Sequence, residues 1–218
     1  MMDEFLDYNR YTNLDGVEWR IIDFLINSTD EHAESLWKML KYNTIDCLSQ
    51  PSVPIKERRA MVYKDDGVSD DKNVFMMPYV NDSWTAQSAR LDVFVDRIVP
   101  VNQVYSQVNI GFEIIVHNKI NNIKNNANEI NNPNPGEFNN DDELVIKYKS
   151  RATSLLAALL AELNGRDVAG VGTLQHNTQI NSYSLTRYQM FNNKDYYGFY
   201  TVMTTLMGET SNSPDYGW

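Results

Sequence analysis

Residues 104–118 read VYSQVNIGFEIIVHN, and this stretch decides the fold class. Apolar side chains recur at every second position from Val108 to Val116, and mostly polar ones stand between them. Because successive side chains of a β-strand point to opposite faces, this spacing predicts a long strand with one apolar face and one nearly polar face. A strand of this length needs neighbours to pair with, and the flanking sequence supplies them.

The chain just before this stretch supplies the first neighbour. Residues 90–96, RLDVFVD, alternate in the same way, and the pattern bends at Pro100. A tight turn at 101–103 predicts an antiparallel hairpin from about residue 90 to residue 118. The alternative is one extended ribbon that contains a bend or a bulge.

Further strands are predicted on both sides of the hairpin. Residues 172–191 and 196–207 are rich in β-forming residues and flank the turn-prone sequence NNKD at 192–195. A short strand is predicted at 74–80, where Pro78 favours a sheet edge or a strand end.

Helices are predicted before and between the β segments. Residues 17–42 carry apolar side chains at helical spacing and predict two short helices, with Ser28 and Glu31 at capping-box spacing between them. Residues 143–163 are apolar around most of a helix circumference and predict one long, well-covered helix. The whole pattern predicts an α+β fold, with an antiparallel sheet of four or five strands packed on that helix and with N-terminal helices.

Two segments lack such patterns. Residues 50–73 contain helix-stopping prolines and a charged run at 56–59 that we expect to be solvated. Eleven of the 23 residues in 118–140 are Asn, which predicts a mobile loop or the tip of an insertion. We therefore expect three regions: an N-terminal helical and extended segment over 1–89, an α+β core over 90–208 with an Asn-rich insertion at 118–142, and a C-terminal tail at 209–218.

Composition limits the classes of function. A chain of 218 residues with 42% apolar residues can bury the core of one domain. Its net charge of −10 argues against gripping nucleic acid, because that affinity comes mainly from Lys and Arg. The single cysteine excludes an intrachain disulfide, and neither a secretory signal nor a membrane-length apolar run is apparent, so we expect a soluble protein made in the cytoplasm.

The ionisable residues form no recognisable catalytic or metal-binding pattern. Asp92 and Asp96 fall on one face of a predicted strand, which is conceivable for paired carboxylates but is more typical of a half-exposed polar face. Cys47 is expected to be a small buried residue. The three histidines lack metal-ligand spacing: His32, His117 and His176. We therefore expect no catalytic residues, no cofactor and no metal.

Tyrosine is the one conspicuous residue type, with 13 Tyr against 8 Phe. Tyrosines crowd the C-terminal strands, where they fit either cross-strand packing or a subunit interface. Together with the Asn-rich loop and the terminal aromatic residue, they give the candidate interface residues Tyr105, Asn122, Asn126, Asn132, Tyr183, Tyr188, Tyr196, Tyr200 and Trp218.

The order of these segments resembles the neck and tail-completion proteins of tailed bacteriophages, which include head–tail connectors and tail terminators. The resemblance is carried by RLDVFVDRIVPVNQVYSQVNIGFEIIVHN at 90–118, SRATSLLAALLAELNG at 150–165, SYSLTRYQMF at 182–191 and YYGFYTVMTTLM at 196–207. It covers 90–118 and 150–208 and rests on element order and strand texture rather than on a diagnostic motif. The Asn-rich insertion and residues 43–89 depart from the pattern.

This resemblance implies a non-enzymatic virion structural protein. It implies a homo-oligomeric ring in the neck or tail-terminating region, made in the host cytoplasm and joined to neighbouring neck, portal or tail proteins. DNA would pass through the ring without specific binding, and no membrane or cofactor would be involved.

Two other classes of protein stay open at this point. One is a small enzyme whose site is built from unpatterned residues such as His117, His176, Asp92 and Asp96, which predicts a turnover that a histidine substitution abolishes. The other is a monomeric module that binds a peptide through the Tyr-rich sheet, which predicts a ligand-dependent change in tyrosine fluorescence.

Overall fold

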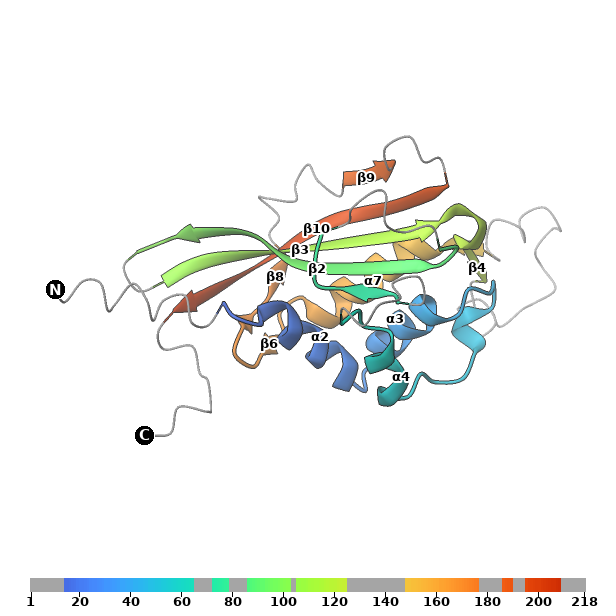
Figure 1. Cartoon of the computed structure of the whole chain (residues 1–218), viewed down its shortest axis with the longest axis horizontal. Coiled ribbons are helices and arrows are strands. Elements are labelled where there is room, and N and C mark those ends of the chain that lie inside the picture. The colour runs from blue at the N-terminus through green and yellow to red at the C-terminus, as the bar shows by residue number, and fades with distance from the viewer. Residues whose placement is uncertain are drawn as a thin grey trace, which may run out of the picture.

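A main sheet with helices on one of its faces, together with two small two-stranded sheets, makes up the described part of the molecule (Figure 1). The computed structural model describes residues 14–64, 72–78, 86–102, 105–124, 148–176, 186–189 and 195–208. The sheet has six strands, five of them in the order β1-β2-β3-β10-β8, with β9 also paired to β10. The predicted α+β class, with a mostly antiparallel sheet and N-terminal helices, is confirmed.

The predicted hairpin forms the middle of the sheet. Strands β2 (Ala89–Pro100) and β3 (Tyr105–His117) pair antiparallel along their whole length, so the reading as one extended ribbon was wrong. The register shifts by one residue between Val95 and Arg97. Such a shift is a β-bulge, which bends a strand and increases its twist.

Strand β10 (Tyr196–Gly208) pairs with all of β3 and confirms the prediction for 196–207. Within the strand predicted over 172–191, the described residues form three short strands: β7 (Gly172–Thr173), β8 (Gln175–His176) and β9 (Thr186–Gln189). Strands β8 and β9 pair with β10, whereas β7 pairs with β6 (Asp167–Val168) in a separate small hairpin. Residues 177–185 and 190–191 lie outside the described residues. Strand β1 (Val74–Phe75) covers only the start of the strand predicted at 74–80, and it pairs with β2 in parallel.

Helices α2 (Val17–Asn27) and α3 (Glu31–Lys41) confirm the predicted pair. The cap between them differs from the prediction. Asp30, not Ser28, is the N-cap residue of α3, since its Oδ1 accepts from the His32 N–H at 3.2 Å. Ser28 instead accepts from the Asp30 N–H through its Oγ, also at 3.2 Å.

The predicted helix over 143–163 is shorter than expected. Helix α7 (Arg151–Leu163) has 13 residues and begins after Ser150, whose Oγ accepts from the Thr153 N–H. The residues before it form β5 (Tyr148–Ser150), paired with β4 (Asn122–Lys124), and this pairing takes the backbone that a longer helix would need. Residues 143–147 and most of the Asn-rich segment lie outside the described residues.

The apolar face of the hairpin is confirmed as the core face of the sheet. Every second residue of β3 from Val108 to Val116 is at most 1% exposed and belongs to one cluster with the inward residues of α2, α3 and α7. The opposite face, called here the outer face, was expected to be half exposed. It is buried in the body of the sheet, where Arg90, Asp92 and Glu113 are 2%, 0% and 8% exposed.

The prediction that residues 56–59 are solvated holds for three of them, and the fourth, Arg58, is a buried arginine. These residues form part of α4 (Ile55–Ala60), and Arg58 is only 6% exposed. Its Nη1 donates to the carbonyls of Ile26 and Ser28 at the end of α2, and its Nη2 pairs with Glu34. A guanidinium is favourable at this position because the last carbonyls of a helix have no hydrogen-bond partner within the helix.

A second buried arginine joins three more elements. Arg151, the first residue of α7, has no exposed surface. Its guanidinium donates to the carbonyls of Met39 in the last turn of α3 and of Tyr42 and Thr44 just after it, at 2.6–2.7 Å. It also donates to the Ile120 carbonyl in η2 (Asn118–Ile120) at 2.8 Å. Burial lowers the pKa of Arg151, and four carbonyl acceptors compensate its charge.

Candidate interaction surfaces

The strands run past the helices at one end and form an arm (Figure 1). We define the arm as residues 96–102, 105–108 and 205–208. The residues of β2 are buried at 89–93 and exposed at 96–100. The arm therefore belongs to the same strands as the core. Its residues 96–102 and Tyr105 are exposed, whereas Ser106, Val108, Thr205 and Met207 within it remain buried.

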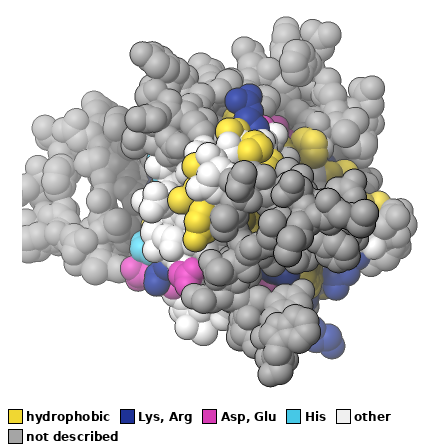
Figure 2. All heavy atoms as spheres, turned by 90° about the vertical axis from the view of Figure 1, so that its left-hand side faces the viewer, with side chains coloured by type: hydrophobic (Ala, Val, Ile, Leu, Met, Phe, Trp, Pro, Cys, Tyr) yellow, Lys and Arg dark blue, Asp and Glu magenta, His cyan; other side chains and the backbone are white. Residues whose placement is uncertain are grey.

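Apolar side chains cover the outer face of the arm. Val99 lies opposite Gln107, which lies opposite Leu206, so the register puts these three residues on one face. Val101 and Tyr105 follow on the same face at the tip. The exposed fractions are 40% for Val99, 56% for Val101, 41% for Tyr105 and 61% for Leu206. Figure 2 views the molecule from this end and shows hydrophobic side chains gathered there among polar ones.

An aromatic pair continues this apolar face toward the body. The rings of Phe94 and Tyr200 stack with centroids 6.3 Å apart, from the strands on either side of β3. Gly111 lies beneath them, and a Cβ at that position would come within 2.8 Å of the Phe94 ring. Glycine therefore lets the two rings approach each other across the middle strand.

The structure places the predicted interface residues in several regions. Tyr105 is at the arm tip, Tyr200 is in the aromatic pair, and Asn122 is exposed on β4. Tyr196 lies at the other end of β10, where it is 3% exposed and its hydroxyl donates to the Ala86 carbonyl at 3.3 Å. Tyr188 is on β9, but its side chain is outside the described part. Asn126, Asn132, Tyr183 and Trp218 also lie outside the described residues.

Sequence reasoning missed Val99, Val101 and Leu206. The signal was present in residues 98–101, IVPV, because apolar residues there occupy both faces of the strand instead of one. A strand that is apolar on both faces is covered on both, either by its own chain or by another molecule.

The four ionisable residues named for an enzyme are not brought together. Asp92 lies opposite Glu113, whereas His117 lies four residues further along β3, beside Tyr196. Asp96 is at the bulge on β2, and His176 is on β8, three strand positions across the sheet. Within the ranges that the structure describes, no three His, Cys, Asp or Glu side chains are grouped to hold a metal ion.

Asp92 is the most perturbed of these groups. Its Oδ1 lies 2.5 Å from Nε of Arg90, which stacks over the Phe75 ring at 3.7 Å. Its Oδ2 has no hydrogen-bond partner among the described residues. Burial raises the pKa of Asp92 to about 8, even though the Arg90 charge opposes this shift.

Cys47 is buried, as predicted, and burial raises the pKa of its thiol.

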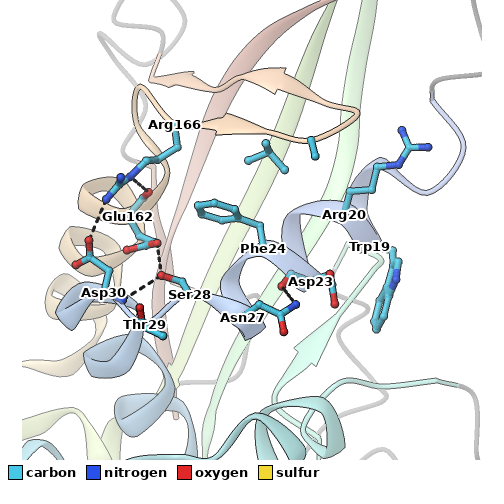
Figure 3. Close-up of a pocket in the computed structure, with 12 residues that line it drawn as sticks. Trp19, Arg20, Asp23, Phe24, Asn27, Ser28, Thr29, Asp30, Glu162 and Arg166 are labelled. Carbon is cyan, nitrogen blue, oxygen red and sulfur yellow. Dashed lines mark hydrogen bonds and ion pairs between the residues drawn. The ribbon is translucent and has the colours of Figure 1, made fainter. Parts of the chain in front are cut away.

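A groove of about 700 Å³ separates α2 from the end of α7 (Figure 3). Trp19 and Phe24 of α2 line its length, and Asp30, Glu162 and Arg166 line one end. Arg166 Nη2 lies 2.9 Å from Asp30 Oδ2, and the Ser28 hydroxyl donates to Glu162 Oε1 at 2.7 Å. Arg20, Asp23 and Asn27 also line the groove along α2. The groove therefore has two aromatic side chains among polar ones along its length and a cluster of charged groups at one end.

Comparison with known families relates this chain to one family. The family model named YomW matches residues 33–205. The chain belongs to the YomW family. That name is of a Bacillus phage SPBc2-type protein, so the match indicates a phage protein. No curated protein and no solved structure matches the chain.

The YomW match includes the arm only as far as residue 205, so that Leu206 lies just outside it, and it includes only one side of the groove. The span 33–205 contains β2, β3 and α7, whereas α2 precedes it. In the part of the chain that is described, no helix is long and apolar enough to cross a membrane.

Proposed function

We propose that this phage protein is a non-enzymatic structural component of the virion. It assembles into a homo-oligomeric ring in the neck or tail-terminating region, between the capsid and portal on one side and the tail on the other. The observation that carries the proposal is the arm, which presents the exposed apolar side chains Val99, Val101, Tyr105 and Leu206 on one face.

The arm is suited to pack against a second copy of the chain. Contiguous apolar surface on a soluble protein marks an interaction site, because its exposure to water costs free energy. A contact between the arm of one subunit and a different surface of the next is heterologous, and repeated rotation closes such contacts into a ring.

The outer edge of β2 supports the same interpretation. Its pairing with β1 covers only Leu91 and Asp92, and the Glu18 carboxylate accepts from the Val95 N–H at 3.2 Å. A carboxylate at this position discourages further strand pairing near the body. Contacts of the arm with a neighbour are therefore directed to its apolar face rather than to that edge.

The net charge of −10 fits a ring that surrounds passing DNA. Phosphates are repelled by an acidic wall, so DNA moves through the channel without specific binding. The other partners in this proposal are the adjoining neck, portal or tail proteins.

Native mass spectrometry across a concentration series, followed by electron microscopy, tests the proposal. We expect the wild-type chain to form one closed oligomer as concentration rises. Leu206→Glu places a charge in the apolar face and is expected to shift the chain to monomers. Ile55→Glu, at a 45% exposed position on α4, is the matched control and is expected to assemble like the wild type.

Two outcomes contradict the proposal. Assembly of Leu206→Glu at wild-type concentrations would show that the arm is not the contact. A strict monomer for all three chains would instead favour a monomeric peptide-binding module.

A further inference from the structure

We propose that the groove between α2 and the end of α7 binds an arginine side chain presented by a partner polypeptide. Glu162 and Asp30 receive the guanidinium at the charged end, and the rest of the segment lies along Phe24 toward Trp19 (Figure 3). This inference is independent of ring formation, because no residue of the arm lines the groove.

The first observation is a buried carboxylate with spare acceptor capacity. Glu162 is 1% exposed, and its Oε1 accepts from the Ser28 hydroxyl. Its Oε2 is buried and has no hydrogen-bond partner among the described residues. A buried polar atom without a partner costs free energy, and a charged donor from another molecule removes that cost.

The second observation is that the charged end already holds one guanidinium. Arg166 pairs with Asp30 through Nη2, and its Nε donates to the Glu162 backbone carbonyl at 3.3 Å. The pair is open to solvent, with side chains 48% and 31% exposed for Arg166 and Asp30. Exposed ion pairs contribute little stability, so an incoming arginine can displace Arg166 from Asp30 and reach Glu162 at small cost.

The geometry of these acceptors favours arginine over a compact cation. Guanidinium is planar, binds carboxylate oxygens through two parallel N–H groups and stacks on aromatic rings. Glu162 and Asp30 present two carboxylates at one end of the groove, and Figure 3 shows the Phe24 ring beside that end.

The length of the groove indicates a polypeptide rather than a free ion. Its lining runs from Trp19 to Asp30 along the chain. The part from Trp19 to Ser28 follows nine helical steps, or roughly 13 Å at the rise of an α-helix. An extended segment of about four residues spans that distance. Trp19, which is 37% exposed, then offers an aromatic surface to the far end of the segment.

The test is an NMR titration of the full-length protein with N-acetyl-arginine methylamide and with its citrulline analogue. Citrulline has the same shape but carries a neutral urea group. We expect saturable shifts of the Phe24, Ser28 and Glu162 amides with the arginine compound, and at least about tenfold weaker binding of the citrulline compound, since one charge-assisted hydrogen bond is lost.

Two variants sharpen the titration. Glu162→Gln keeps the shape of the side chain and is expected to weaken arginine binding by about tenfold. Glu31→Gln makes the same change at an exposed position next to Asp30 and is expected to leave binding unchanged.

Equal binding of the arginine and citrulline compounds to the wild-type protein would overturn the proposal, and so would wild-type affinity in Glu162→Gln. The comparison of the two compounds needs no variant, so it decides the matter even if Glu162→Gln fails to fold.

Discussion

The two ends of the central hairpin contrast sharply in what they bury. In the body, β2 buries charged residues, with Arg90 and Asp92 at 2% and 0% exposure. In the arm, the same strand exposes Val99 at 40%. Hydrophobicity alone predicts a buried valine and exposed charged residues. The difference supports the proposal that the arm contacts another molecule, whereas the body buries its charges within one chain.

The body accepts buried arginines because each of them has several partners. Arg58 and Arg151 are held by carbonyls at the ends of α2 and α3, and Arg90 contacts Asp92 and the Phe75 ring. Removing one member of such a set leaves the others buried and unpaired, which costs more than the original interaction contributed. Substitutions in the body should therefore have large effects on folding, and substitutions in the arm should have small ones.

The largest expected effect is that of Arg151→Ala. It leaves four carbonyls, from Met39, Tyr42, Thr44 and Ile120, without this donor. We expect the free energy of unfolding to fall by at least about 4 kcal/mol, at 1–3 kcal/mol for each of four unsatisfied groups, which approaches the whole stability of a domain. Urea denaturation followed by circular dichroism measures the loss.

Arg59→Ala is the matched control for this prediction. Arg59 is 52% exposed and its Nη2 is 3.9 Å from the Asp23 carboxylate. A change of less than about 0.5 kcal/mol is expected for so exposed a pair. Equal losses in the two variants would contradict the role given to Arg151.

An intermediate effect is expected from the titration of Asp92. Its pKa is about 8 in the folded chain and about 4 when unfolded. The folded state therefore binds this proton more tightly than the unfolded state does. Protonation of Asp92 contributes fully to the free energy of unfolding below pH 4, and that contribution is lost as the pH rises to 8. The loss should be roughly 3 to 5 kcal/mol.

Asp92→Asn removes this titration and is expected to flatten the dependence of stability on pH over that range. Asp96→Asn makes the same change at an exposed position in the arm and should leave the slope unchanged. Denaturation of the three proteins at pH 4, 6 and 8 provides the comparison. A wild-type slope retained in Asp92→Asn would show that another group is responsible.

The smallest expected effect on folding comes from the arm. Leu206 is 61% exposed, so Leu206→Glu should change the unfolding free energy of the dilute chain by less than about 0.5 kcal/mol. A large loss would show that the arm is part of the core and would remove the contrast between the two ends.

The hairpin and its core face could be predicted because their signal is local. Alternation from Val108 to Val116 is visible within a few residues and matches the burial of the strand. The start of α7 was misplaced because residues 148–150 pair with β4, which is more than twenty residues away in sequence. A local helical pattern carries no information about that pairing.

The buried arginines and the groove also could not be predicted from local sequence patterns, because they depend on contacts between distant residues. Arg58 reaches carbonyls 30 and 32 residues away, and Arg151 reaches others more than 100 residues away. The Ser28–Glu162 contact joins residues 134 positions apart. A charged residue in a single sequence gives no indication of whether distant carbonyls will gather around it.

The bulge on β2 determines which way the arm faces. Asp96 is an extra residue with no partner on β3, and because of it Val99 shares the outer face with Phe94. Regular pairing of Asp96 with Asn109, without the bulge, would place Ile98 opposite Gln107 on the outer face and turn Val99 toward the core face. Deletion of one residue at 96 would instead remove the bulge and leave Val99 opposite Gln107 on the outer face. The face of the arm that carries Val99 therefore depends on how the strand accommodates one extra residue.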